Sequence, residues 1–253
     1  MSLNETSIFD IAKRQFYFKL HANASVFTVL FILQIISTIF LLGSGSSGNF
    51  HHSHDSTSLT WASFSNDGIV GLTLFWAIVV GFLCTSTAQR NESFAFVSNR
   101  FTYHLANLYF LCFAAIIGGV TTVLLGSATK LYALLRYDHV IIATSGLLNA
   151  PGDFFSRFLV MTAYTLLVSI LCYTVGMLIQ LSRLFIMLLA ALFIGLRLFI
   201  GLNLSSLNTE KIDLVGFITD EQSTILFIVK IVLIVAALFF FSVWSTNRIE
   251  VRK

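Results

Sequence analysis

The sequence predicts an all-α, polytopic membrane protein: six transmembrane helices, an N-terminal interfacial amphipathic helix, and both ends on the cytoplasmic side. Of the 253 residues, 57% are hydrophobic and only 11% are charged, whereas soluble domains carry about 25% charged residues. The apolar residues form blocks of about twenty, which is the length of a membrane-spanning helix. Barrel strands would instead alternate over roughly ten residues. We therefore treat 1–253 as a single transmembrane domain.

The first segment, 1–24, is predicted to form a cytoplasmic amphipathic helix along the inner leaflet. Apolar residues recur there at helical spacing, and three cations lie close to them. This pattern is typical of a helix that lies in the membrane interface. The alternative is a cytoplasmic extension of the first span. The apolar residues are Ile8, Ile11, Ala12 and Phe16, and the cations are Lys13, Arg14 and Lys19.

Six apolar blocks are long enough to cross the hydrocarbon core of a bilayer as helices. The first four contain no Asp, Glu, Lys or Arg, the fifth contains Arg197 and the sixth contains Lys230. These blocks predict spans at about 25–43, 68–85, 105–126, 158–181, 184–203 and 223–244.

The Lys and Arg residues of the connections predict the orientation, since cytoplasmic loops are enriched in them. With the N-terminus inside, nine such residues lie on the cytoplasmic side and four outside. A seventh span over 131–149 would bury Arg136 and Asp138, at a cost of about 2.5–3.5 kcal/mol for each central charge. We therefore expect 128–150 to be an exterior or interfacial segment. The inner set is Lys13, Arg14, Lys19, Arg90, Arg100, Arg183, Arg248, Arg252 and Lys253, and the outer set is Lys130, Arg136, Arg157 and Lys211.

The outer loop 44–67 contains a candidate metal site. Imidazole and carboxylate groups suit zinc, copper or nickel, and four such groups fall within five residues. The alternative is a solvated tract in a Ser/Gly-rich loop, because no neighbouring residues are evident that would orient the rings. The candidate ligands are His51, His52, His54 and Asp55.

Arg197 and Lys230 are the only ionised side chains within the predicted spans. Helical rise places both at middle-to-outer depth. One interpretation is that each faces a cavity and meets an anionic group of a substrate or lipid. The alternative is that their long side chains extend to the interface, where the charge reaches water.

The cytoplasmic connection 86–103 is longer than a simple hairpin requires. Phe94, Val97 and Phe101 follow the i, i+3, i+7 spacing of one helix face. Glu92 lies near the start of this possible helix, where an acidic residue is favoured by the helix dipole. A short helix with aromatic residues suits a partner's pocket. The alternative is that the aromatic residues lie at the membrane boundary, where such rings are enriched.

Together, the six-span plan, the N-terminal helix and the connection resemble the permease subunit of a bacterial type-2 ABC exporter. The sequence motif is an acidic residue, an aromatic-rich stretch and Ser-Asn-Arg before the third span, here 92–100. The resemblance implies that this connection is a coupling helix that docks into a separate ATPase. The implied docking residues are Glu92, Phe94, Phe96, Val97, Arg100 and Phe101.

No catalytic or nucleotide-binding motif is evident in the chain, so we expect it not to be an enzyme and to hold no cofactor. The Gly-rich stretch 43–49 lacks the Lys-Ser/Thr ending of a phosphate-binding loop. The resemblance implies that ATP and Mg²⁺ are bound by ATPase partners, and that a second permease copy or paralogue is present. It also implies contact with lipids of a bacterial plasma membrane and none with nucleic acid. The cargo would be amphipathic or hydrophobic: a peptide, an antibiotic or a lipid-linked molecule.

Two other classes stay open. A self-contained channel or secondary carrier would have intramembrane polar groups paired along a pathway, or repeated halves. A membrane sensor or immunity protein would bind a toxic peptide, with the His-rich loop and 127–157 as its binding face.

Overall fold

The computed structural model describes residues 8–44, 47–48, 61–62, 66–86, 89, 100–136, 151–181 and 224–247. These residues are almost entirely helical, and a single two-residue strand pair joins Ser47–Gly48 to Trp61–Ala62 in antiparallel register. In chain order, the elements are α1 (Ile8–Ala22), α2 (Ala24–Ser44), β1 (Ser47–Gly48), β2 (Trp61–Ala62), α3 (Asp67–Thr85), α5 (Arg100–Arg136), α6 (Pro151–Leu181) and α9 (Thr224–Asn247).

Five helices within the described ranges are long and apolar enough to cross a membrane: α2, α3, α5, α6 and α9. They correspond to five of the six predicted spans, and 184–203, the remaining one, lies outside the described residues. The chain is therefore an all-helical, multi-pass membrane protein. Its apolar blocks form helices because a helix satisfies its own backbone hydrogen bonds where lipid offers none.

The third and fourth predicted spans are longer than their apolar blocks. Helix α5 has 37 residues and α6 has 31, so α5 is about 55 Å long, against a hydrocarbon core of about 30 Å. Helix α5 includes 100–104, expected largely in the cytoplasmic connection, and 127–136, expected mostly in the exterior segment. In the first of these extensions Thr102, Tyr103 and His104 are buried, so neighbouring helices and not lipid surround their polar groups. Helix α5 ends at Arg136 and α6 begins at Pro151.

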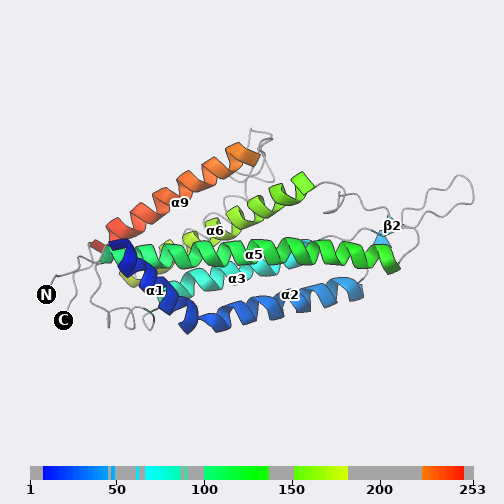
Figure 1. The fold of residues 1–253 in the computed structure, drawn as a ribbon, viewed down its shortest axis with the longest axis horizontal. Helices are drawn as coiled ribbons and strands as arrows, with labels where there is room; N and C mark the ends of the chain where they lie inside the picture. Colours follow the sequence, from blue (N-terminus) through cyan, green and yellow to red (C-terminus); the bar gives the residue numbers. More distant parts are fainter. Residues whose placement is uncertain are drawn as a thin grey trace, which may run out of the picture.

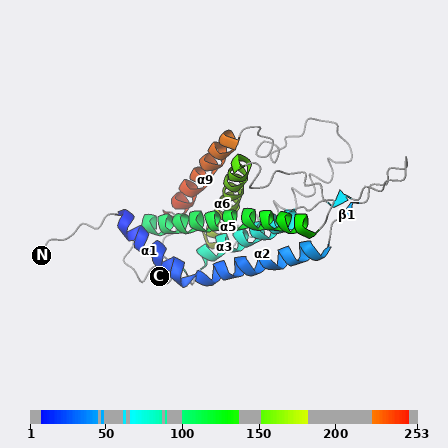
Figure 2. The same ribbon diagram turned by 45° about the vertical axis from the view of Figure 1, so that its right-hand side comes forward.

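Helices α3, α5 and α6 form the centre of the bundle. Helix α3 packs most extensively against α6, and α5 packs against both. Figures 1 and 2 show α2 and α9 on opposite sides of these three helices, with α1 crossing the start of α5. Large side chains such as Phe40 and Phe240 are exposed on α2 and α9, as expected for surfaces that face lipid.

The core is apolar and tightly packed. Its largest buried members include Trp76, Phe110, Ile170 and Tyr173. The indole Nε1–H of Trp76 donates to the carbonyl of Val26 at 2.9 Å and so links α3 to α2. This partner satisfies a polar group that would otherwise be costly to bury.

Small residues allow the helices to approach closely. A Cβ at Gly119 of α5 would lie 3.1 Å from the backbone nitrogen and 3.2 Å from the Cα of Thr162 on α6. A Cβ at Gly81 of α3 would lie 2.8 Å from the Cβ of Cys172 on α6. Close backbone approach at small residues is typical of helix packing in membranes, where apolar burial gives little drive for association.

Candidate functional site

A polar cluster occupies one end of the bundle. We call it the basal cluster, and it comprises Lys19 of α1, Tyr103, His104 and Asn107 of α5, and Tyr173 of α6. All five side chains are buried. Buried polar groups carry a cost unless they are paired, so the contacts of each member determine what the cluster can do.

Helix α1 supplies the cation, Lys19, because the face of α1 that carries this residue is buried. Its buried residues are Ala12, Gln15 and Lys19, which share one face by the i, i+3, i+7 rule. Phe9 and Phe18 flank this face and are exposed. The sequence placed Lys19 with the surface cations, whereas it lies against α5. Ile8, expected on the apolar face, is also exposed.

The ammonium group of Lys19 has two contacts on α5. It donates a hydrogen bond to the side-chain oxygen Oδ1 of Asn107, and its Nζ lies 4.3 Å from the centroid of the Tyr103 ring. A cation over an aromatic face within about 6 Å is attracted by the ring quadrupole, and the attraction is larger when the pair is desolvated. These contacts explain how a lysine can be buried there.

The hydroxyl of Tyr173 joins α6 to the same group. Asn107 donates from Nδ2 to Tyr173 Oη at 3.1 Å, and His104 Nδ1 lies 2.7 Å from the same oxygen. Ser242 of α9 is fully buried and also interacts with Tyr173. The basal cluster thus extends from α1 through α5 to α6, with Ser242 of α9 beside it.

Further hydrogen bonds fix the chain segments around the basal cluster. Tyr103 Oη donates to the carbonyl of Cys84 at 3.1 Å, near the end of α3. The amide of Gln180 donates to the carbonyl of Thr85, and Gln89 donates to Asn23 at the junction of α1 and α2. The end of α3, the start of α5, the end of α6 and α1 are therefore held together at one place.

The chemistry of the basal cluster suits positioning better than catalysis. It contains one cation, one imidazole, one carboxamide and two phenols, with no carboxylate among its five members. Each hydrogen bond among the five members joins two different helices, and interhelical hydrogen bonds of this kind stabilise membrane proteins by about 0.6 kcal/mol on average. The cluster is a joint between helices.

A second polar group lies deeper between the spans. The amide nitrogen of Gln34, on α2, lies 3.0–3.1 Å from the hydroxyls of Thr73, Thr121 and Thr122. Each threonine hydroxyl also donates to a carbonyl of its own helix. We call this group the threonine cluster. Buried apolar residues of α5, among them Phe110 and Ala114, lie between it and the basal cluster along the chain.

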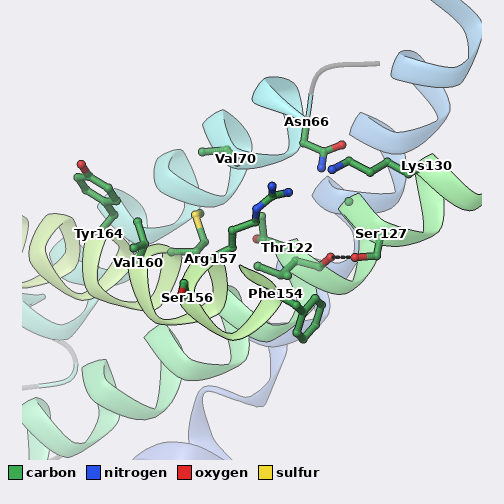
Figure 3. A pocket seen from close by; sticks show the side chains of 13 residues that line it. Asn66, Val70, Thr122, Ser127, Lys130, Phe154, Ser156, Arg157, Val160 and Tyr164 are labelled. Carbon is green, nitrogen blue, oxygen red and sulfur yellow. Dashed lines mark hydrogen bonds between the residues drawn. The ribbon is translucent and has the colours of Figure 1, made fainter. Parts of the chain in front are cut away.

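A cavity of about 430 Å³ opens at the opposite end of the bundle, between α3, α5 and α6 (Figure 3). It contains two cationic side chains, several hydroxyl and amide groups, and an apolar wall. The thirteen lining residues are Asn66, Val70, Thr122, Val123, Gly126, Ser127, Lys130, Phe154, Ser156, Arg157, Val160, Met161 and Tyr164.

The predicted docking residues are only partly described. Glu92, Phe94, Phe96 and Val97 lie outside the described residues. Arg100 is the first residue of α5, and Phe101 follows it with 39% of its surface exposed. Docking at this segment therefore stays a prediction.

The other predicted site residues are also mostly outside the described ranges. These are Arg197 and the candidate metal ligands His51, His52, His54 and Asp55. Lys230 is described, and it lies half-buried on α9, next to the buried Ile231. The structure does not bring Lys230 into the basal cluster or the cavity, and its role in a substrate pathway stays a prediction.

Sequence reasoning missed both the basal cluster and the cavity. One available signal was the pair His104 and Asn107, three residues apart at the edge of an otherwise apolar block. Another was the pair Lys130 and Arg157, which lie just beyond the ends of successive spans and were counted only as loop charges.

Comparison with protein-family models, with curated proteins and with solved structures found no match. The functional interpretation therefore depends on the sequence pattern, the basal cluster and the cavity.

Proposed function

We propose that this chain is the membrane-spanning permease subunit of an ATP-driven ABC exporter in a bacterial plasma membrane. In this proposal the chain has six spans and cytoplasmic ends, and α1 lies along the inner leaflet. The observation that carries the proposal is the basal cluster. It joins α1 to the two helices that flank the 86–103 connection, which is the segment proposed to dock into an ATPase.

The joint gives a physical route for mechanical coupling. A force on 86–103 acts directly on the end of α3 and the start of α5, because the connection joins them. Gln89 links the same connection to Asn23, and Lys19 links α1 to α5. Packed helices move as semi-rigid bodies, so a push by the ATPase would displace α1, α3, α5 and α6 together rather than bend one loop.

The energy source must be another subunit, because the chain has no recognisable nucleotide-binding motif. Two ATPases would bind ATP and Mg²⁺, and a second permease copy or paralogue would complete the pathway. The cargo would be an amphipathic or hydrophobic molecule moved outward. The cavity at the end opposite the basal cluster supports this proposal, since it offers an amphipathic group a place near the outer boundary.

The test is co-purification and transport with ABC ATPases co-expressed from the organism that encodes this chain. Arg100→Glu and Phe94→Asp should each abolish ATPase binding and transport, because both change the docking surface. Arg136→Glu is the matched control for Arg100→Glu, since it reverses the charge at the other end of the same helix, and it should leave binding intact. A chain that transports without any ATPase, or keeps transport in both docking variants, would rule the proposal out.

A self-contained carrier is the second candidate, because polar side chains are buried at two depths of the bundle. The basal cluster and the threonine cluster could hold a polar solute in turn if the apolar layer between them opened. Flux by the purified chain in liposomes without ATP would favour this candidate. Loss of that flux in Gln34→Leu, with the fold intact, would assign the threonine cluster to its pathway.

A further inference from the structure

The cavity between α3, α5 and α6 lies near one membrane boundary. Along α5, Lys130 is 23 residues beyond Asn107 of the basal cluster, which corresponds to about 35 Å of helix. This distance exceeds the hydrocarbon core of about 30 Å, so the two polar sites lie near opposite boundaries. A ligand in the cavity would have its polar part at the level of the lipid head groups.

The charged residues that line the cavity are both positive. Lys130 and Arg157 both contribute to its lining, and none of the thirteen lining residues is acidic. Figure 3 shows Lys130 and Asn66 converging from α5 and the start of α3, while Arg157 reaches in from α6. The positive charge of Arg157 acts on Lys130, so two like charges face one space. Asp153 precedes Arg157 by four residues on α6 and is the nearest carboxylate in sequence.

The remaining lining residues separate into polar and apolar parts. Ser127 and Ser156 contribute hydroxyl groups to the lining, whereas Val70, Val160 and Met161 contribute apolar surface, which we call the apolar wall. A volume of about 430 Å³ falls in the range of small-molecule sites, about 300–1,000 Å³. Cationic side chains that merely extended to the interface would require no such cavity. The arrangement fits a ligand with an anionic head and an apolar tail.

We propose that this cavity binds the phosphate head group of an anionic amphiphile, with Lys130 and Arg157 as its charged contacts and the apolar wall against its chain. A guanidinium matches the geometry of phosphate oxygens, and a lysine adds a compact charge. The binding site goes beyond the proposed exporter function and does not depend on it, because the contacts involve this chain alone. A resident lipid and a molecule in transit would share this head-group chemistry.

The experiment measures binding to the full chain, purified in a neutral detergent, by native mass spectrometry. The probes are phosphatidylglycerol and phosphatidylcholine with identical short chains, and inorganic phosphate. We expect phosphatidylglycerol to bind at least about tenfold more tightly than phosphatidylcholine. Charge-assisted hydrogen bonds contribute about 1.5–3 kcal/mol, so Lys130→Gln and Arg157→Gln should each weaken phosphatidylglycerol binding by about tenfold or more.

Three further variants separate loss of charge from loss of fold and test the apolar wall. Lys130→Arg keeps the charge and should keep binding, and Arg14→Gln removes an exposed cation of α1 and should change nothing. Val160→Trp retains both cations but places a larger side chain in the part of the cavity next to the apolar wall. It should therefore also weaken phosphatidylglycerol binding. Equal binding of the two lipids, or wild-type affinity in Lys130→Gln, Arg157→Gln and Val160→Trp, would overturn the proposal. Inorganic phosphate binding as tightly as phosphatidylglycerol would overturn the requirement for an amphiphile.

Discussion

Removing the hydroxyl of Tyr173 tests the basal cluster with the smallest change in shape. Tyr173→Phe keeps the ring, which is buried against the core, and removes only the oxygen. That oxygen is the shared partner of Asn107 Nδ2 at 3.1 Å and of His104 Nδ1 at 2.7 Å. The substitution therefore leaves two buried polar groups of α5 without the partner on α6.

The expected loss of stability follows from these two contacts. Interhelical hydrogen bonds in a membrane protein contribute about 0.6 kcal/mol on average and up to about 1.7 kcal/mol. Two such bonds give about 1–3 kcal/mol. The upper part of this range applies if His104 cannot reach another partner, and its Nε2 is already buried without a hydrogen bond to any described residue.

Stability would be measured by reversible unfolding in mixed micelles with increasing sodium dodecyl sulfate, followed by tryptophan fluorescence. Tyr164→Phe is the matched control, because it removes a phenol from the same helix where the side chain is only half-buried and lines the cavity. We expect this control to change the free energy of unfolding by less than about 0.5 kcal/mol. Equal stability of Tyr173→Phe and the wild type would show that the basal cluster does not hold α5 to α6.

Other predictions concern packing, the threonine cluster and orientation. Gly119→Ala should destabilise the bundle by about 1–3 kcal/mol, because the new methyl group meets the backbone of α6. Gly118→Ala is the control: its new methyl group meets only side chains, at 3.4–3.5 Å, and it should be tolerated in the same unfolding assay. Gln34→Leu should change stability by less than about 1 kcal/mol, because the threonine hydroxyls keep their backbone acceptors, and a larger loss would mean that the amide itself holds α2. In a cysteine-free background, an impermeant maleimide should label Gly152→Cys and not Lys13→Cys in intact cells if both chain ends are inside; the reverse pattern would refute that orientation.

The positions of three spans could be predicted closely from the apolar blocks. The blocks 25–43, 68–85 and 223–244 correspond to α2, α3 and α9, whose ends differ from them by at most a few residues. This agreement has a physical cause, because the thickness of the hydrocarbon core sets the length of a lipid-exposed helix. Helices α2 and α9 are exposed on much of their surface, so lipid is their main solvent.

Both ends of α5 and the start of α6 could not be predicted in the same way, whereas the end of α6 at Leu181 agrees with the predicted span 158–181. Polar residues at the start of α5, such as Thr102 and His104, are buried by neighbouring helices. Hydropathy assigns such residues to a loop because it measures transfer into lipid and contains no term for partners elsewhere in the chain. The same limit applies to Lys19, whose partner Asn107 is 88 residues away.

The candidate site was predicted only at the level of residue type. The sequence identified cations as the functional groups to seek, but it selected those inside spans, Arg197 and Lys230. The cavity instead uses Lys130 and Arg157, which are just outside the predicted spans and on different helices. Their proximity depends on how α5 packs against α6, and it cannot be read from the spacing along one helix.

The burial of Lys19 also sets an order of assembly during synthesis. When α1 leaves the ribosome, the helix that receives its lysine does not yet exist, since Asn107 follows 88 residues later. At a synthesis rate of about 5–20 residues per second, Asn107 is made roughly 4–18 s after Lys19. Tyr173 on α6 is made later still. Helix α1 therefore enters its final position only after α5 is inserted, so a docked α1 marks a chain in which α5 is already in place.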